Sequence, residues 1–168
     1  MPDQHTLDET ERAMTARVEH LAMDFPAAHA VSSIYRAANA ARSHLTNTAL
    51  RPHDLTWTGF LVLWLLWIWD RMETRRVAEN VGISKATLTG VTNTLVARGL
   101  VERIPGTVDR RLVELELTPE GQRLMSDLFP KFNAAEAELV AGISESDREV
   151  LTRCLRQIVT TAEGLAGQ

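Results

Sequence analysis

Residues 84–117 read SKATLTGVTNTLVARGLVERIPGTVDRRLVELEL, and this stretch of the 168-residue chain decides the fold. Ser84 is a preferred residue before the first turn of a helix, and Gly99 is preferred just after the last turn. Segments 100–104 and 111–117 then favour strands, the second because apolar side chains alternate with glutamates. The stretch therefore predicts one helix followed by a two-stranded hairpin.

A second, shorter helix is expected immediately before this one. It runs from about residue 73 to residue 80 and ends at Gly82, so that the two helices meet in a tight turn. Further upstream, Thr56 can begin a helix over 57–70, which is apolar on nearly every side and is therefore central in the fold. This apolar run is shorter than the roughly 20 residues that cross a bilayer, so no membrane association is expected.

Amphipathic helices are predicted on both sides of this module. Apolar side chains recur every three or four positions over 27–45, 124–139 and 151–165, and residues 7–23 favour a weaker helix. These apolar stripes need a partner, which an oligomer would provide. We expect a mainly α fold with a small β-wing: N-terminal helices, a winged helix-turn-helix domain and C-terminal helices, over residues 1–50, 51–118 and 119–168.

Charge is distributed unevenly along the chain. Residues 73–111 hold seven Lys or Arg against four acids, a balance of +3, whereas the rest holds 11 basic and 18 acidic residues, or −7. The whole chain carries −4. An electropositive segment on an acidic body is typical of a local anion-binding surface. Because the major groove of B-DNA admits one α-helix and a hairpin can reach the neighbouring minor groove, a helix-turn-helix followed by a hairpin indicates double-stranded DNA.

The outward face of the helix after Ser84 supplies candidate DNA contacts. At 100° per residue, Leu88, Val91 and Leu95 share the inward side. On the opposite side, small residues would let the helix approach the bases, hydroxyl and amide groups can bond base edges, and the N-terminal end would meet phosphate. The residues with these roles are Ser84, Lys85, Ala86, Thr87, Thr89, Gly90 and Asn93. Taken singly, each also fits a solvated surface position.

The predicted hairpin carries a second set of candidate contacts at its tip. Arg110 and Arg111 project near the turn, and an arginine can enter a narrow minor groove, where the negative potential is strongest. Asp109, two residues before Arg111, can hold that guanidinium through a bidentate pair. The alternative is an exposed surface ion pair worth ~0–1 kcal/mol.

The run from Leu55 to Gly121 resembles the core of the multiple antibiotic resistance regulator (MarR) family. Its most specific pieces are residues 109–111, DRR, similar to the family's Asp-x-Arg wing, and residues 117–121, LTPEG, similar to its Leu-Thr-x-x-Gly. The resemblance implies a homodimer with paired winged-helix domains and repression relieved by a ligand. It also implies that Arg111 contacts DNA while Asp109 positions it.

Such a dimer would bind a pseudo-palindromic operator, because two recognition helices related by a two-fold axis meet half-sites about 34 Å apart. Double-stranded DNA and a second copy of the chain are thus the expected partners. The N-terminal sequence carries acids and no apolar stretch, so it does not fit a secretory signal, and a cytoplasmic location is expected.

The resemblance also implies a small-molecule effector, since members of the family often bind aromatic acids or phenols between the dimer helices and the winged domain. The candidate contacts combine aromatic walls with donors for a carboxylate. They are Tyr35, Arg36, His44, Trp57 and Trp64. For the two tryptophans, which lie seven residues apart on a helix expected to be buried, packing in the core is the alternative.

Other kinds of chemistry find little support in the sequence. Cys154 is the sole cysteine, which excludes an intrachain disulfide and a multi-cysteine zinc site, and we expect it to be a small core residue rather than an oxidant sensor. The five histidines form no i, i+4 pair, which disfavours metal binding, and no nucleophile or phosphate-loop motif appears, so neither an enzyme nor a cofactor is expected. The remaining alternatives are a winged-helix dimer that docks a protein, or a regulator that responds to an oxidant or a metal.

Overall fold

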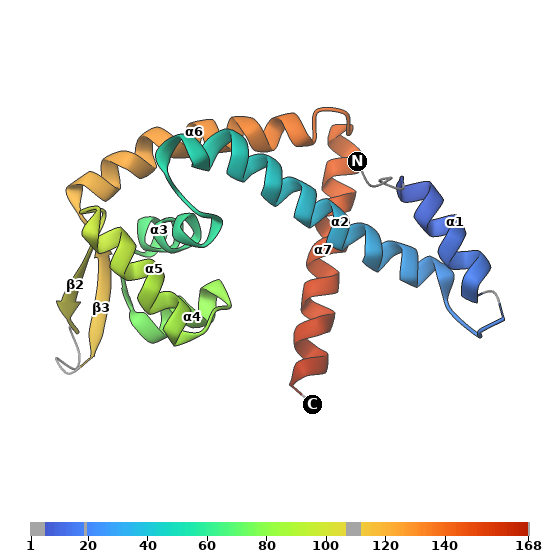
Figure 1. The fold of residues 1–168 in the computed structure, drawn as a ribbon, viewed down its shortest axis with the longest axis horizontal. Helices are drawn as coiled ribbons and strands as arrows, with labels where there is room; N and C mark the ends of the chain where they lie inside the picture. Colours follow the sequence, from blue (N-terminus) through green and yellow to red (C-terminus); the bar gives the residue numbers. More distant parts are fainter. Residues whose placement is uncertain (1–5, 19, 107–111, 168) are drawn as a thin grey trace. The chain divides into compact units, whose positions relative to one another are not determined.

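The computed structural model describes residues 6–18, 20–106 and 112–167. The chain divides into two compact units, Met1–Ser43 and His44–Gln168 (Figure 1). The first unit consists of N-terminal helices, and the second contains the winged module with the C-terminal helices. The three-part domain division expected from the sequence stays a prediction.

The first unit contains α1 (Leu7–Val18) and most of α2 (Phe25–Leu45). A capping box begins α1: Thr6 Oγ1 accepts from the Glu9 backbone N–H over 3.2 Å, and Glu9 Oε2 accepts from the Thr6 backbone N–H over 2.7 Å. These hydrogen bonds, the one from the Thr6 backbone first, lower the pKa of the Glu9 carboxyl. The weak helix predicted over 7–23 is confirmed, but it ends at Val18.

The second unit begins where α2 ends. The chain continues through a π-helical turn, Thr46–Leu50, and a 3-10 turn, Arg51–His53, so the regular α-helix ends before Pro52. Helix α3 (Trp57–Trp69) follows, and its N-cap is the predicted one, since Thr56 Oγ1 accepts from the Gly59 backbone N–H over 3.0 Å. None of the helices in the described residues has the length and apolarity needed to cross a membrane.

The predicted helix-turn-helix is formed by α4 (Thr74–Val81) and α5 (Lys85–Ala97). Gly82 ends α4 with a φ of 73°, and Gly99 follows α5 with a φ of 69°. This left-handed conformation is open to glycine without steric cost and reverses the chain after a helix. Both predicted stops are therefore confirmed.

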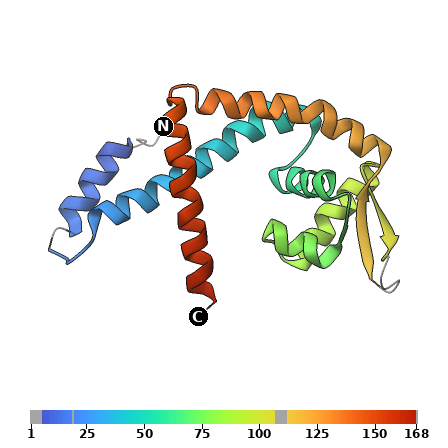
Figure 2. The ribbon, with the colours of Figure 1, turned by 180° about the vertical axis from the view of Figure 1, so that it is seen from behind.

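The β-wing belongs to a sheet of three strands, where two were predicted. β1 (Arg71–Glu73) and β2 (Val101–Pro105) both pair antiparallel with β3 (Val113–Leu117), which lies between them. The predicted hairpin is formed by β2 and β3, whereas β1 was not predicted because three residues are too few for an alternating pattern to be recognised. Helices α3, α4 and α5 pack against this sheet (Figure 2).

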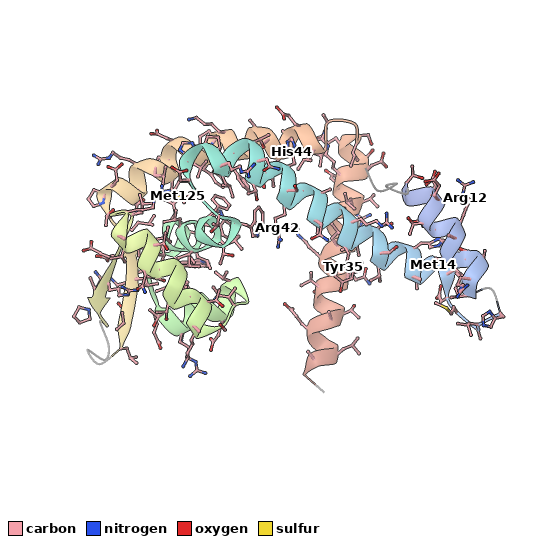
Figure 3. All side chains as sticks on the ribbon, in the orientation of Figure 1. Arg12, Met14, Tyr35, Arg42, His44 and Met125 are labelled. Carbon is pink, nitrogen blue, oxygen red and sulfur yellow. The ribbon has the colours of Figure 1, made fainter. Side chains whose placement is uncertain are left out.

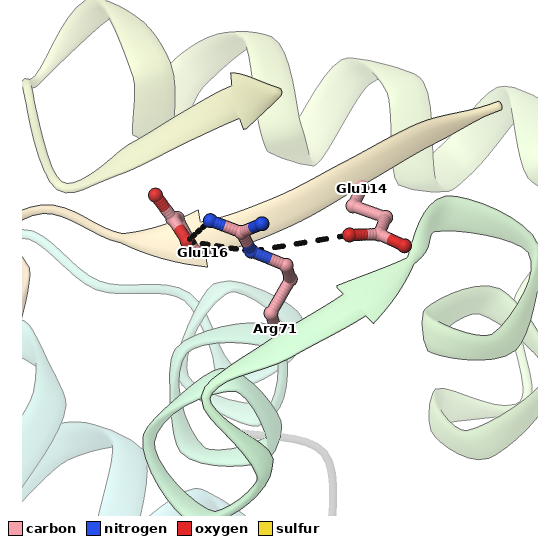
Figure 4. Close-up of polar contacts among 3 residues, drawn as sticks. All are labelled: Arg71, Glu114 and Glu116. Carbon is pink, nitrogen blue, oxygen red and sulfur yellow. Dashed lines mark hydrogen bonds and ion pairs between the residues drawn. The ribbon is translucent and has the colours of Figure 1, made fainter. Parts of the chain in front are cut away.

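A cross-strand ion pair holds β1 against β3. Arg71 is directly opposite Glu116, and its Nη2 and Nε lie 2.7 and 2.9 Å from Glu116 Oε2. The same guanidinium lies 3.9 Å from Glu114 Oε2 (Figure 4). Opposite charges at facing positions stabilise an antiparallel pair, which helps so short a strand to form.

The core of the second unit lies around α3 and is closed by α6 (Pro119–Leu139). Phe60 of α3 stacks on Phe132 of α6 with ring centroids 4.3 Å apart. Met125 of α6, labelled in Figure 3, is fully buried. Burying one large apolar side chain contributes roughly 1.5–3 kcal/mol. The side chains with 0% exposure are Leu50, Val62, Leu63, Leu66, Val77, Leu115, Met125 and Leu128.

The last helix, α7 (Glu145–Ala166), contributes nothing to this core. Ser144 caps it, its Oγ accepting from the Asp147 backbone N–H over 3.2 Å. All of its residues are exposed in the single chain, including the predicted apolar stripe. Cys154 is exposed as well, so its assignment to the core was wrong. The helical period had identified an apolar stripe correctly, but not what the stripe packs against.

Candidate nucleic-acid interface

The inward side of helix α5 packs against the core of the second unit. Leu88 and Leu95 are 3% and 2% exposed, and Val91 packs beside them, as the helical period predicted. Thr92, which was not assigned to that side, is also buried. This side contacts α3, α4 and β2, so α5 is a rigidly supported element.

The other side of α5 is open. All seven residues proposed to contact DNA along this helix are exposed. At Gly90, an added Cβ would meet no heavy atom of the described residues within 4 Å, so no neighbouring element accounts for a glycine there. The open side is thus narrow and polar, and it is made by Ser84, Lys85, Ala86, Thr87, Thr89, Gly90 and Asn93.

Hydrogen bonds at the start of α5 determine which donors and acceptors its hydroxyl groups can still offer to DNA. Ser84 Oγ accepts from the Thr87 backbone N–H over 3.1 Å and lies 2.9 Å from the Thr87 hydroxyl. The Thr89 hydroxyl donates to the Lys85 carbonyl over 2.8 Å. Because its hydrogen is engaged, Thr89 can present acceptor lone pairs and a methyl group to a base edge.

A hollow of about 650 Å³ lies beside α5, between the start of α4 and the strands. Three cations line it: Arg75 from α4, Lys85 from α5 and Arg103 from β2. The Glu79 carboxylate lies 2.8 Å from Arg75 Nε and raises the pKa of that guanidinium, through the hydrogen bond first and charge second. Glu73 lines the hollow as well and Glu79 pairs with Arg75, so these acids offset part of the positive charge that Arg75, Lys85 and Arg103 contribute.

Arg103 is the residue of this surface that sequence reasoning missed. Its Nη2 donates to Asn93 Oδ1 over 2.7 Å. In the sequence, Arg103 counted only toward the charge of its segment, because nothing in a strand pattern shows which helix the side chain will reach. The packing of β2 against α5 brings the two side chains together.

The proposed wing-tip contacts, Asp109, Arg110 and Arg111, lie outside the described residues. The base of their hairpin is described: β2 and β3 are paired in register, and the Gly106 backbone N–H donates to the Leu112 carbonyl over 2.9 Å. The hairpin predicted for this segment is therefore confirmed up to these two residues, and the roles of the tip residues stay predictions.

Two of the candidate effector contacts belong to the aromatic part of the core. The ring of Trp57 lies 6.2 Å, between centroids, from those of both Phe60 and Phe132. Trp64 is half-buried and packs against the same core. Core packing, the alternative considered for these tryptophans, thus accounts for their positions.

The other three candidates lie along α2 (Figure 3). Tyr35, which is 69% exposed, and Arg36 are exposed in the first unit. His44, in the second unit, is half-buried, with Nε2 3.7 Å from Glu138 Oε2. Within the described ranges, no three or more His, Cys, Asp or Glu side chains are grouped to hold a metal ion.

Comparison with known proteins decides the family of this winged-helix module. Residues 55–113, from the approach to α3 as far as the start of β3, match the family model of the MarR family. The Bacillus subtilis protein YwaE, an uncharacterized HTH-type transcriptional regulator, is 36% identical over 127 residues, which cover 76% of this chain and 74% of YwaE. The chain belongs to the MarR family. It is therefore a DNA-binding transcriptional regulator and not an enzyme.

Solved structures of MarR-type regulators share the fold. PcaV from Streptomyces coelicolor is 26% identical, with a TM-score of 0.66 and coverage of 81% of this chain and 98% of PcaV. BpsR from Bordetella bronchiseptica, whose DNA binding is regulated by 6-hydroxynicotinic acid, is also 26% identical, with a TM-score of 0.69 and coverage of 76% and 91%. The resemblance seen in the sequence is confirmed at the level of family and fold.

Proposed function

We propose that this MarR-family protein is a homodimeric repressor that binds a pseudo-palindromic operator. In each protomer, α5 enters a major groove through its exposed small and polar side, while Arg111, positioned by Asp109, enters the neighbouring minor groove. The exposed polar side of α5, with no packing role for Gly90, is the observation that carries this proposal. Lys85 beside α5 supplies charge for the phosphate backbone.

The dimer in this proposal is formed by the N- and C-terminal helices. Leu151, Leu155 and Ile158 of α7 are 42%, 37% and 45% exposed, and Val31 of α2 is 50% exposed. Apolar stripes left uncovered in one chain support burial against a second copy. Because a regulator works where the DNA is, we place the protein in the cytoplasm.

An aromatic acid is the effector class that we propose for release from DNA. BpsR, a relative with the same fold, has its DNA binding regulated by such a compound. In this chain an aromatic acid would meet aromatic rings and donors for its carboxylate. The residues proposed for this contact remain Tyr35, Arg36, His44, Trp57 and Trp64.

The Arg111→Ala variant tests the DNA-binding arrangement. Fragments of genomic DNA that the wild-type protein retains supply the operator, and fluorescence anisotropy measures its affinity. We expect Arg111→Ala to abolish operator binding while the dimer and its helical circular dichroism remain. Wild-type binding should weaken steeply as salt rises, with a log-log slope of about −0.9 per phosphate neutralised.

Arg123→Ala on α6, which removes the same charge elsewhere, is the matched control and should bind like the wild type. Operator affinity retained in Arg111→Ala would contradict the wing assignment. A wild-type protein that retains no DNA fragment at low salt would instead favour a winged-helix dimer that docks another protein.

Thermal unfolding with a panel of small aromatic acids tests the effector. A ligand at 100 times its dissociation constant adds about 2.7 kcal/mol to the free energy of unfolding, so its binding raises the midpoint temperature. Arg36→Met should reduce this rise by removing a carboxylate donor, whereas Arg42→Met, on the same helix, should retain it. If no acid raises the midpoint, or if both variants lose the rise equally, the proposed contacts are wrong.

A further inference from the structure

Arg103 and Asn93 form a pair that joins the β-wing to the open side of α5. Arg103 Nη2 donates to Asn93 Oδ1 over 2.7 Å, although one residue lies on β2 and the other on α5. Both side chains are exposed, and both line the hollow beside α5. The pair therefore lies on the surface that we propose to face DNA.

The strand register explains why Arg103 reaches α5. Across the β2–β3 pair, Arg103 is directly opposite Leu115, and along β2 it is two residues from Val101. These two neighbours are 0% and 1% exposed, so all three residues share the side of the sheet that packs on the helices. Because a charged group is costly in that core, the Arg103 stem extends along it and the guanidinium emerges beside α5.

This hydrogen bond decides which end of the Asn93 amide is offered to a ligand. An amide has a carbonyl acceptor and an NH₂ donor, whereas a guanidinium has donors only. Oδ1 is thus the group that must face Arg103, since a flipped amide would set its NH₂ against a cation. Nδ2 is left as the group that Asn93 can direct at a base edge.

We propose that Arg103 is a positioning residue for sequence specificity: by holding Oδ1, it makes Asn93 donate from Nδ2 to a keto base, guanine or thymine, in each operator half-site. In the major groove, guanine presents two acceptors, O6 and N7, and thymine presents O4, whereas cytosine presents only an amino donor and adenine presents an amino donor beside its N7 acceptor. The inference rests on the proposed DNA-facing role of α5 and names which base edge that helix selects.

Selection of bound duplexes from a random-sequence library, with the full-length protein, tests the proposed role of Arg103. The wild type should prefer guanine or thymine at one position of each half-site by about fivefold or more. Arg103→Met and Asn93→Ala should both lose the preference at that same position, and the double variant should lose no more than either, because the two residues act as one unit. Asn93→Asp, which is an acceptor only, should reverse the preference to adenine or cytosine.

Arg123→Met, which removes one positive charge from α6, should keep the wild-type preference. Circular dichroism and thermal midpoints verify that each variant is folded. The inference is overturned if Arg103→Met weakens binding to all sequences equally and lowers the salt slope by about 0.9 with the preference intact, since Arg103 is then a phosphate contact. The inference is also overturned if Arg103→Met loses the preference at a different position from Asn93→Ala. If the wild-type protein selects no sequence, the proposed function itself is wrong.

Discussion

At the scale of single residues, Gly121 shows how one missing side chain allows two elements to meet. The start of α6 lies against the residues after α5: the Thr118 hydroxyl donates to the Gly99 carbonyl over 2.6 Å, and the Thr118 backbone N–H donates to the Leu100 carbonyl over 3.1 Å. A Cβ at Gly121 would clash with that same Leu100 carbonyl oxygen. The glycine of the LTPEG motif is thus explained by a close approach of backbone, and its threonine by capping α6.

Gly121→Ala should lower the free energy of unfolding by about 1–3 kcal/mol, because the clash is with backbone and must be relieved by moving α6 or the Leu100 segment. Urea denaturation measures the change. Gly142→Ala is the matched control, since a Cβ there meets no heavy atom of the described chain within 4 Å and φ is not positive. Equal stability of the two variants would contradict this account of the motif.

At the scale of elements, α5 combines a well-packed inner side with an outer side on which Gly90 lowers the stability of the helix. Gly90 lies in the middle of the helix, where glycine costs about 1 kcal/mol relative to alanine. No heavy atom of the described residues lies within 4 Å of where a Cβ at Gly90 would be, so packing does not require glycine at this position. In the proposed complex the gain is steric, because a residue without Cβ allows α5 to lie deeper in the groove.

Gly90→Ala should therefore raise the free energy of unfolding by roughly 0.5–1 kcal/mol while weakening operator binding. Chemical denaturation and anisotropy titrations measure the two effects separately. Ala134→Gly, at an exposed position within α6, should instead lower the free energy of unfolding and leave operator affinity unchanged in the folded protein. A Gly90→Ala variant that binds operator as well as the wild type would show that the groove does not require this glycine.

At the scale of the whole molecule, the single chain leaves one of its longest helices uncovered. The large apolar side chains of α7, from Val150 to Leu165, are between 37% and 68% exposed. A helix of this kind gains little stability from its own chain, because helical stability in proteins comes mostly from packing of an apolar face. A second copy provides that packing in our proposal.

Leu155→Glu should convert the dimer to a monomer at micromolar concentration, because it places a charge in the centre of the proposed apolar interface. Sedimentation equilibrium measures the mass, and operator affinity should fall with it, since one module contacts only one half-site. Gln157→Glu, which adds the same charge off the apolar stripe of α7, should remain dimeric. A dimer that persists in Leu155→Glu would place the interface elsewhere.

Sequence alone sufficed wherever the physical cause lies within a few residues. The predicted caps Thr56 and Ser84 each accept the backbone N–H three residues later, which requires only the local chain. The periodicity of α5 likewise predicted which of its residues are exposed. These signals determined the helices, the wing hairpin and the exposed residues of the candidate site, although the function of each of those residues stays a prediction.

Only the tertiary structure decided the contacts between distant elements. β1 pairs with β3, where Arg71 contacts Glu116, 45 positions away, and the register of β2 directs Arg103 to Asn93. Cys154 lies outside the core because α7 does, which the helical period cannot show. A pattern within one element specifies which side is apolar or charged, whereas the partner of that side depends on how all elements pack together.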